Sequence, residues 1–451
     1  MIVLILTTVI LLGALPAAAL EPEEPYLVLL QEHPVSLLAA DKLTPVAPES
    51  GIYLVEDRGT AEAMVEQGVA LACAPNCTVE LLGDFTVPTP NDSGSSWHWQ
   101  AIGADYPAAV GCTGKGVRIA LVDSGVYVDH PELKAAKIEP GWNYVDGNED
   151  ISDGVGHGTF IAGLLAAQPD NGAGICGLCP DATLVPLKAF SATIGTLDTA
   201  LAAIEDAWKK YDCDIIHMSF GILAQSLKEE NRLIMEVALE TASEHALLVA
   251  AAGNSNGTAA YYPAAYEGVL SVAAVSQGLS RWTSGFYGSQ YNDTVDLAAP
   301  GGDITSLSTS GELIIGSGTS YAAPLATAAA ALLLEREPEL TGAELTERLM
   351  ASAQDLGEPG RDDEYGAGLL RVDRLLIEDA TAAAAEDGTY FVQLPQGGSL
   401  ISAAYDDDGR FLGAQVKTLP EGTFGYYTPA ADVFLLDEAA RPLTPAVSAT
   451  P

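Results

Sequence analysis

The segment 117-VRIALVDSGV-126 decides the fold class of this chain, because it reads as a short buried strand that ends in an acidic residue. Similar apolar runs follow it, and several are joined by helical segments such as 197-LDTALAAIEDAWKKY-211. The runs are "TLVPLKAF", "DIIHMSFG", "ALLVAAAGN", "VLSVAAV" and "TVDLAAP". Near-continuous apolar strands of this kind are typical of a parallel sheet covered on both faces. We therefore predict a three-layer α/β domain over residues 97–377.

Two smaller units flank this domain. In residues 20–90, the runs "YLVLL", "GIYLVED" and "TVELLG" resemble strands and "TAEAMVEQG" a helix, which predicts a small α/β unit. The stretch 87-VPTPNDSGSS-96 has the composition of a linker. Residues 378–386 resemble a spacer, and the tail at 387–446 reads as a small all-β module.

Composition excludes several classes of partner. The chain has 451 residues, 48% of them hydrophobic, and its 20 basic and 61 acidic residues give a net charge of −41. Such a charge repels phosphate backbones and anionic headgroups, so we expect neither nucleic-acid nor membrane-surface binding. Residues 1–19 form a short apolar run ending in Ala17-Ala18-Ala19, although no Lys or Arg precedes it. This pattern predicts a signal peptide and a secreted protein, with an uncleaved anchor or a mis-assigned start as the alternatives.

Polar residues follow the predicted strands at the edge of the sheet where ligands gather. Asp123 ends the first strand, His157 lies in 154-GVGHGTFIAG-163, and Ser320 opens the helical run "YAAPLATAAAALLLER". These residues supply an acid, a base and an alcohol, which together can activate a serine nucleophile. Asn254 comes just past another strand, where its amide could complete an oxyanion hole with the Ser320 N–H.

Four segments that carry these residues, "ALVDSGV", "GHGTFIAG", "AAGNSNG" and "GTSYAAP", resemble the signature segments of subtilisin-like serine proteases. The resemblance covers about 97–377 and implies a secreted serine endopeptidase that needs no cofactor for its chemistry. It implies that Asp123 orients His157, that His157 is the general base and acid, and that Ser320 is the nucleophile. Asn254 would stabilise the oxyanion. Tyr321 departs from the family, which usually has Met after the nucleophile.

The same resemblance suggests where a peptide substrate binds. "HMSFG" is similar to the family's "NMSLG", so Ser219, Phe220 and Gly221 should form one wall of the specificity pocket, with Ala252 and Gly253 opposite. The loop around Gly195 should pair with an extended substrate. Tyr261 should reach the pocket floor, and we predict apolar side chains of limited size there. His217 stands where the family has Asn, and we interpret it as a hydrogen-bonded structural residue.

The resemblance further implies that residues 20–90 are a pro-domain, which assists folding and acts as an intramolecular inhibitor of the cleft. We predict self-cleavage between Asp84 and Trp97. Oxygen-bearing side chains alternate before the catalytic His, a pattern that suits a calcium cage or a solvated acidic turn. They are Asn143, Asp146, Asn148, Asp150 and Ser152.

Six cysteines in an exported chain suggest disulfides. Cys73 and Cys77 could pair across a turn. The others precede strands and should cluster at the edge opposite the chemistry, as two disulfides or as a four-thiolate zinc site. They are Cys112, Cys176, Cys179 and Cys213.

Two other functions compete with the protease. An α/β-hydrolase esterase would need a G-x-S-x-G segment and a serine that precedes its Asp and His. Here Ser320 comes last in the chain, which disfavours that class. The second alternative is a catalytically silent binding protein derived from a protease, which hydrolysis of a protein substrate would exclude.

Overall fold

The computed structural model describes residues 25–31, 43–82, 84–85, 97–104, 107, 111–169 and 174–376, together with the strands between residues 381 and 448. The predicted signal peptide and the predicted linker at 87–96 lie outside these residues. No helix in the described ranges has both the length and the apolar character needed to cross a bilayer.

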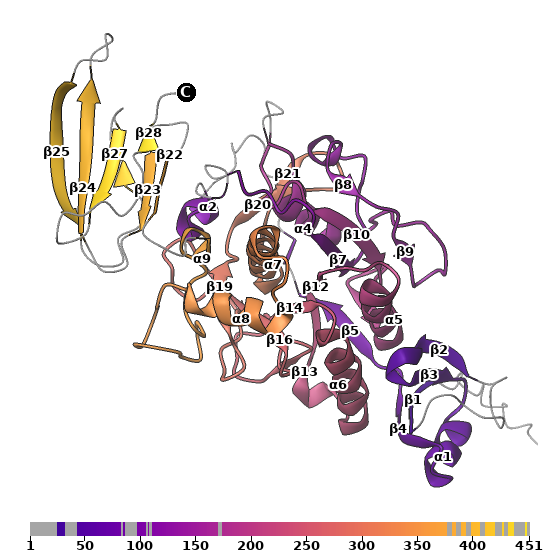
Figure 1. Cartoon of the computed structure of the whole chain (residues 1–451). Helices are drawn as coiled ribbons and strands as arrows, with labels where there is room; N and C mark the ends of the chain where they lie inside the picture. The colour runs from indigo at the N-terminus through magenta and orange to yellow at the C-terminus, as the bar shows by residue number, and fades with distance from the viewer. Residues whose placement is uncertain are drawn as a thin grey trace, which may run out of the picture.

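A parallel sheet forms the centre of the catalytic region, in the order β19-β16-β14-β12-β7-β10-β8, with β9 also paired to β10 (Figure 1). Its strands are β7 (Arg118–Asp123), β8 (Lys137–Ile138), β9 (Trp142–Asn143), β10 (Thr183–Lys188), β12 (Ile215–Met218), β14 (Leu247–Ala251), β16 (Val269–Val275) and β19 (Leu297–Pro300). Neighbouring strands run parallel throughout. Each of the six apolar runs quoted from residues 97–377 contributes to this sheet, which confirms the predicted fold class.

Helices cover both faces of the sheet, because side chains of a strand point alternately to its two sides. From β7, Ile119 and Leu121 pack in one core with residues of α4 (His157–Ala166) and α7 (Thr319–Arg336). Ala120 and Val122 pack in a second core with α5 (Leu197–Lys209) and α6 (Glu229–Ser243). Two shorter helices, α8 (Gly342–Ala351) and α9 (Val372–Leu375), contact α7.

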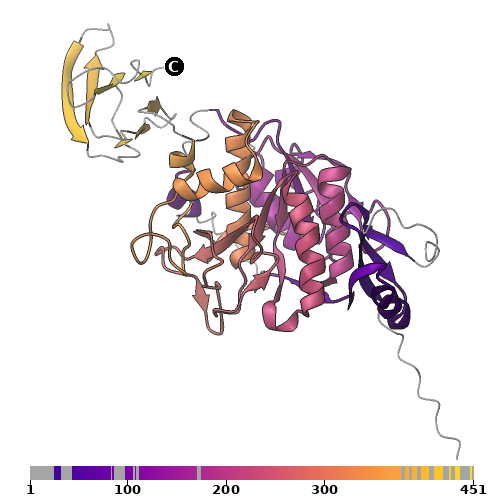
Figure 2. The ribbon, with the colours of Figure 1, turned by 60° about the horizontal axis from the view of Figure 1, so that its bottom comes forward.

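The N-terminal unit is an antiparallel sheet in the order β2-β3-β1-β4, with one helix. Its elements are β1 (Tyr26–Leu30), β2 (Thr44–Ala47), β3 (Ile52–Val55), α1 (Arg58–Glu66) and β4 (Ala70–Pro75). The prediction missed β2 and β4. Figures 1 and 2 both show this unit, in indigo, against α5 and α6.

Polar contacts hold the N-terminal unit to these helices. The carboxylate of Glu205, on α5, accepts hydrogen bonds from the backbone N–H groups of Glu49 (3.0 Å) and Ser50 (3.2 Å). On α6, Asn231 Nδ2 donates to the carbonyl of Pro75 (2.9 Å). The unit is therefore docked through specific hydrogen bonds as well as apolar packing.

The C-terminal strands form two small sheets, β22-β23-β26 and β25-β24-β27-β28, which make a separate group in both views (Figures 1 and 2). Their bounds are β22 (Thr381–Ala384), β23 (Thr389–Gln393), β24 (Gly398–Tyr405), β25 (Phe411–Leu419), β26 (Tyr426–Tyr427), β27 (Asp432–Leu436) and β28 (Val447–Ser448). The predicted spacer at 378–386 contains β22, so it is not a simple linker. Its alanines pair with the β-branched and aromatic residues of β23.

The cysteine prediction is not met in the structure, where none of the six cysteines forms a disulfide bond. Cys112 and Cys179 share the core on the α4 and α7 side of the sheet, whereas Cys213 lies in the core on the α5 and α6 side. Residues near the starts of parallel strands share an edge but can still point to opposite faces, so the predicted cluster does not form. Among the described residues, no group of three or more His, Cys, Asp or Glu is arranged to hold a metal, and this includes the zinc alternative.

We expect Gly158→Ala to destabilise the domain by about 1–3 kcal/mol, the cost of overpacking a close contact. A Cβ at Gly158 would lie 2.1 Å from the carbonyl oxygen of Gly125, at the point where α4 meets the end of β7. Thermal unfolding in a Ser320→Ala background, which removes the proposed nucleophile, measures the effect. Gly154→Ala is the matched control, because its Cβ would meet nothing within 4 Å. Equal melting temperatures for the two variants would contradict the prediction.

Candidate active site

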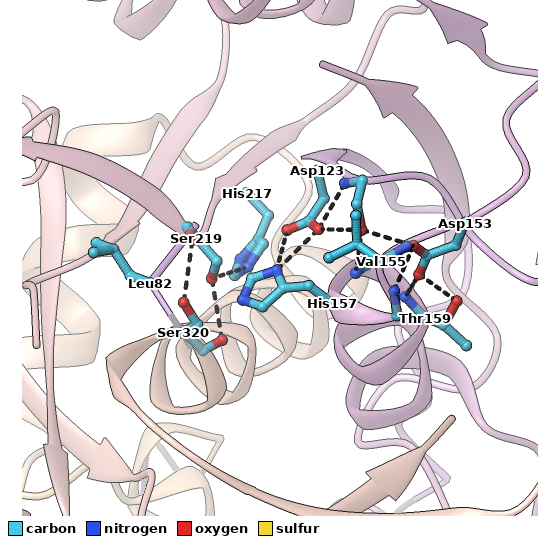
Figure 3. A network of polar contacts seen from close by, with 12 residues as sticks. Leu82, Asp123, Asp153, Val155, His157, Thr159, His217, Ser219 and Ser320 are labelled. Carbon is cyan, nitrogen blue, oxygen red and sulfur yellow. Dashed lines mark hydrogen bonds and ion pairs between the residues drawn. The ribbon is translucent and has the colours of Figure 1, made fainter. Parts of the chain in front are cut away.

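An acid and a base meet at the carboxyl edge of the central sheet. Asp123 is the last residue of β7, and His157 is the first residue of α4. His157 Nδ1 lies 2.8 and 2.9 Å from the two carboxylate oxygens of Asp123, and both side chains are fully buried. A carboxylate at Nδ1 fixes the imidazole tautomer, which directs Nε2 away from the acid. In Figure 3 the imidazole lies between Asp123 and Ser320.

A second acid, Asp153, braces this pair. Ser124 donates to Asp123 through its backbone N–H (2.7 Å), and its hydroxyl lies between the carboxylates of Asp123 (3.1 Å) and Asp153 (2.9 Å). Asp153 also accepts from the backbone N–H groups of Gly156 (2.7 Å) and Thr159 (2.9 Å) at the start of α4. The helix N-terminus is thereby capped by the same carboxylate that orients the Ser124 hydroxyl. Asp153 was not among the predicted site residues.

Ser320 lies in the first turn of α7 and is fully buried. Its hydroxyl donates to the carbonyl of Ser219 (3.1 Å), and the Ser219 hydroxyl donates to the carbonyl of Ser320 (3.1 Å). This reciprocal pair joins the end of β12 to the start of α7 (Figure 3). It fixes the first turn of α7 against the end of β12, with the Ser320 hydroxyl proton directed at the Ser219 carbonyl.

The carbonyl oxygen of Leu82 receives two hydrogen bonds beside Ser320. Asn254 Nδ2 donates to it (2.7 Å), and so does the backbone N–H of Ser320 (3.2 Å). The Asn254 amide is held in this orientation because its Oδ1 accepts from the N–H (2.9 Å) and the hydroxyl (2.8 Å) of Thr319. Two donors that converge on one carbonyl have the arrangement of an oxyanion hole. Thr319 is a further residue that the sequence interpretation missed.

The segment before Leu82 lies in the cleft as an extended strand. Strand β5 (Thr78–Leu81) pairs antiparallel with β11 (Ile194–Thr196) on one side and with β13 (Phe220–Leu223) on the other. Gly195 lies opposite Val79, and Gly221 lies opposite Glu80. The backbone N–H of Leu82 donates to the carbonyl of Ser219 (3.0 Å). The predicted ladder partners therefore contact a strand of the chain itself.

The chain continues past the site in extended form. Strand β6 (Asp84–Phe85) pairs antiparallel with β21 (Leu313–Ser317), which leads into α7. The segments on the two sides of the Leu82–Gly83 bond are thus both held by strand pairing.

Of the predicted pocket residues, Ser219 and Gly221 contact Leu82, whereas Phe220 and Ala252 pack in two other core clusters. Ala252 is almost fully buried, and a Cβ at Gly253 would lie 2.4 Å from the Tyr261 ring. Tyr261 belongs to β15 (Tyr261–Tyr262), which pairs with β13. Leu82 and Tyr261 belong to the same apolar core cluster. Leu82 is an apolar side chain of limited size.

The predicted calcium ligands satisfy one another within their own loop. Asn143 Nδ2 donates to the carboxylate of Asp146 (3.0 Å) and to the carbonyl of Asp150 (3.0 Å). Asn148 and Asp150 accept from backbone N–H groups two residues further on. A calcium ion binds oxygen atoms, and the Asn143 N–H groups are instead directed at the oxygens of Asp146 and Asp150 that would bind it. The geometry fits a turn stabilised by side chains, and the calcium prediction gains no support.

A family model described as the subtilase family matches residues 114–368. This range includes Asp123, His157, Asn254 and Ser320. The chain belongs to the subtilase family. The subtilase is 34% identical over 323 residues to the minor extracellular protease Epr of Bacillus subtilis, covering 71% of this chain and 47% of that protein. It is 32% identical over 378 residues to a thermostable alkaline protease of Halalkalibacterium halodurans, covering 82% of this chain and 98% of that protein.

The solved structure of fervidolysin from Fervidobacterium pennivorans shares the fold, with a TM-score of 0.63 at 21% identity, covering 94% of this chain and 73% of that one. The subtilase spans about half of Epr and nearly all of the alkaline protease. The family and these named proteases support a serine endopeptidase.

His217 extends the hydrogen-bond network of the subtilase below Ser320. Its Nε2 lies 2.8 Å from the Ser219 hydroxyl, and its Nδ1 lies 2.9 Å from the Thr327 hydroxyl. Since the Ser219 hydroxyl donates to Ser320, it must accept from His217, so Nε2 carries the proton and Thr327 donates to Nδ1. Burial lowers the pKa of His217 to about 3, so the ring is neutral at ordinary pH. The interpretation of His217 as a hydrogen-bonded structural residue is confirmed.

We expect His217→Leu to lower kcat by about 10-fold, because a buried hydrogen bond that orients Ser219 and thus Ser320 is lost. His217→Asn should recover most of the activity, since a side-chain amide can donate to Ser219 and accept from Thr327. Steady-state kinetics on a peptide substrate separate kcat from KM, and KM should change little. Because His217 is neutral in the wild type, the acidic limb of the pH profile should be the same in His217→Asn. A leucine variant with wild-type kcat would contradict the prediction.

Proposed function

We propose that this subtilase is a secreted serine endopeptidase, made as a zymogen that cuts its own chain between Leu82 and Gly83. The observation that carries the proposal is the Leu82 carbonyl, which accepts from both Asn254 Nδ2 and the Ser320 N–H. The relatives named as proteases support hydrolysis of protein or peptide substrates. The apolar segment 1–19 and the extracellular relative support export.

In the proposed mechanism, Ser320 Oγ adds to the carbonyl carbon of the bound peptide while His157 Nε2 accepts the hydroxyl proton. The Asp123 carboxylate stabilises the imidazolium that forms. Negative charge moves onto the carbonyl oxygen, where Asn254 and the Ser320 N–H stabilise it. The carbon–nitrogen bond then breaks, His157 gives its proton to the leaving amine, and water hydrolyses the acyl-enzyme. No metal or cofactor is required by these steps.

Residues 20–90 would act as a pro-domain, with β5 as the segment that fills the cleft. Val79 and Leu81 are buried in the core that includes Phe190 and Phe220. Together with the Glu205 and Asn231 contacts, this burial supports a tightly docked inhibitor. The sequence predicted cleavage between Asp84 and Trp97. We place the cleaved bond slightly earlier, after Leu82, because the Leu82 carbonyl accepts from Asn254 and from the Ser320 N–H.

Catalysis is tested by hydrolysis of casein and of a leucine-containing peptide by the purified mature enzyme. We expect Ser320→Ala to lower kcat by about 10⁶-fold and Asn254→Ala by about 10²–10³-fold, the range measured for such residues in a subtilisin. Ser310→Ala, at an exposed position, is the matched control and should retain activity. An inert wild type that still binds peptides would instead support the silent binding protein.

Self-processing is tested by N-terminal sequencing at the earliest times after expression. The wild type should begin at Gly83, whereas Ser320→Ala should retain the N-terminal unit. Leu82→Asp should slow cleavage, because an ionised side chain is costly to bury in an apolar pocket. Cleavage within one molecule should proceed at a rate independent of protein concentration. A first mature N-terminus within residues 85–97, or processing of Ser320→Ala at the wild-type rate, would refute the assigned bond.

A further inference from the structure

Tyr261 contacts the pocket glycines through its ring. A Cβ at Gly253 would lie 2.4 Å from Tyr261 Cδ2, so the ring lies directly on that backbone. A Cβ at Gly221 would lie 3.2 Å from Tyr261 Cδ1 and 3.2 Å from Leu82 Cδ1. The Tyr261 ring and the Leu82 side chain therefore meet over the same glycine. Only 5% of Tyr261 is exposed, so the ring is buried against these glycines and beside Leu82.

Glu80 lies on the same side of the bound strand as Leu82. Side chains two residues apart in an extended segment point the same way. Val79 and Leu81 pack in the core on the α5 and α6 side, whereas Leu82 packs with Tyr261 in the other core cluster. Glu80 pairs with Gly221, the glycine that both the ring and Leu82 approach. The carboxylate of Glu80 is thus placed above the rim of the pocket that Tyr261 lines.

The Tyr261 and Glu80 side chains lie on one face of the paired strands, because Glu80 is opposite Gly221 and Tyr261 is opposite Leu223, two residues further along β13. Burial raises the pKa of the Tyr261 phenol, the Ser255 hydroxyl lowers it, and the negative charge of Glu80 adds a smaller rise. The phenol is therefore protonated at neutral pH and can donate to a carboxylate. The excess of carboxylates in this protein repels an acidic substrate residue, and a hydrogen bond from the Tyr261 hydroxyl would offset that repulsion.

We propose that Tyr261 determines specificity at two substrate positions at once. Its ring limits the pocket to leucine-sized side chains before the cut bond, and its hydroxyl favours an acidic residue two positions upstream of that leucine. The inference rests on the proposed protease function and names its substrate class as extended segments of the form acidic–apolar–leucine. The segment Glu80-Leu81-Leu82 is the chain's own example.

Binding tests the proposal without catalysis. Fluorescently labelled acetyl-Thr-Val-Glu-Leu-Leu and its glutamine analogue are titrated onto Ser320→Ala enzyme. Its N-terminal unit is first cut off at a protease site inserted within residues 87–96 and then dissociated and separated by size-exclusion chromatography. We expect the glutamate peptide to bind about 5-fold more tightly, the worth of a charge-assisted hydrogen bond at a partly exposed site. The ratio should fall to about 1 in Tyr261→Phe, which removes only the hydroxyl. Tyr287→Phe, at an exposed tyrosine, should leave the ratio unchanged.

Cleavage tests the pocket. Peptides with leucine or phenylalanine before the cut bond are compared by kcat/KM on wild type and Tyr261→Ala. The wild type should prefer leucine, and loss of the ring should shift the preference toward phenylalanine by about 10-fold or more. Tyr261→Phe should keep the leucine preference, which separates the ring from the hydroxyl and guards against misfolding of the alanine variant.

The experiments distinguish failure of the Tyr261 proposal from failure of the proposed protease function. Equal binding of the two pentapeptides to Ser320→Ala, or a glutamate preference that survives in Tyr261→Phe, overturns the acidic-residue assignment. An unchanged leucine preference in folded Tyr261→Ala overturns the pocket assignment. An enzyme that binds the pentapeptides as expected but hydrolyses nothing refutes the protease function and leaves the glutamate preference established.

Discussion

The architecture depends on one constraint, which is that all strands of the central sheet run in the same direction. Residues that follow different strands must therefore meet at one edge, however far apart they lie in the sequence. Asp123 ends β7, and Asn254 comes three residues after β14 ends at Ala251. His157 and Ser320 enter from helices that pack side by side on one face of the sheet. The buried contact between His157 and Asp123 is possible only because the backbone of α4 approaches the end of β7 at Gly158.

Around that contact, hydrogen bonds fix each group through a neighbour. Asp153 orients Ser124, Thr319 orients the Asn254 amide, and His217 orients Ser219. Each of these supporting groups is polar, and each has its hydrogen-bonding capacity met inside the protein. A preorganised set of dipoles needs little rearrangement when charge develops, which is the property that an oxyanion site requires.

Much of this was predictable from sequence, and the rest depended on information that sequence patterns do not carry. The apolar runs predicted the sheet because buried parallel strands need continuous hydrophobic residues, and the signature segments pointed to Asp123, His157, Asn254 and Ser320. Asp153 and Thr319 were missed because an ordinary Asp or Thr becomes informative only when its hydrogen-bond partner is known. The prediction of a cysteine cluster was wrong because a residue's position at one edge of the sheet does not determine the face to which its side chain points. The position of Leu82 could not be inferred, since it depends on where a separate unit docks.

The placement of β5 between β11 and β13 has a consequence for the protein once that strand departs. Both neighbours would then present unpaired backbone N–H and C=O groups to water, and such open edges invite pairing with a second copy of the same molecule. The acidity of the chain opposes this, because two strongly acidic molecules repel each other before their edges can meet. The excess of carboxylates thus opposes self-association of a protein whose cleft must stay open to substrate peptides. Salt should weaken this effect by screening the charges.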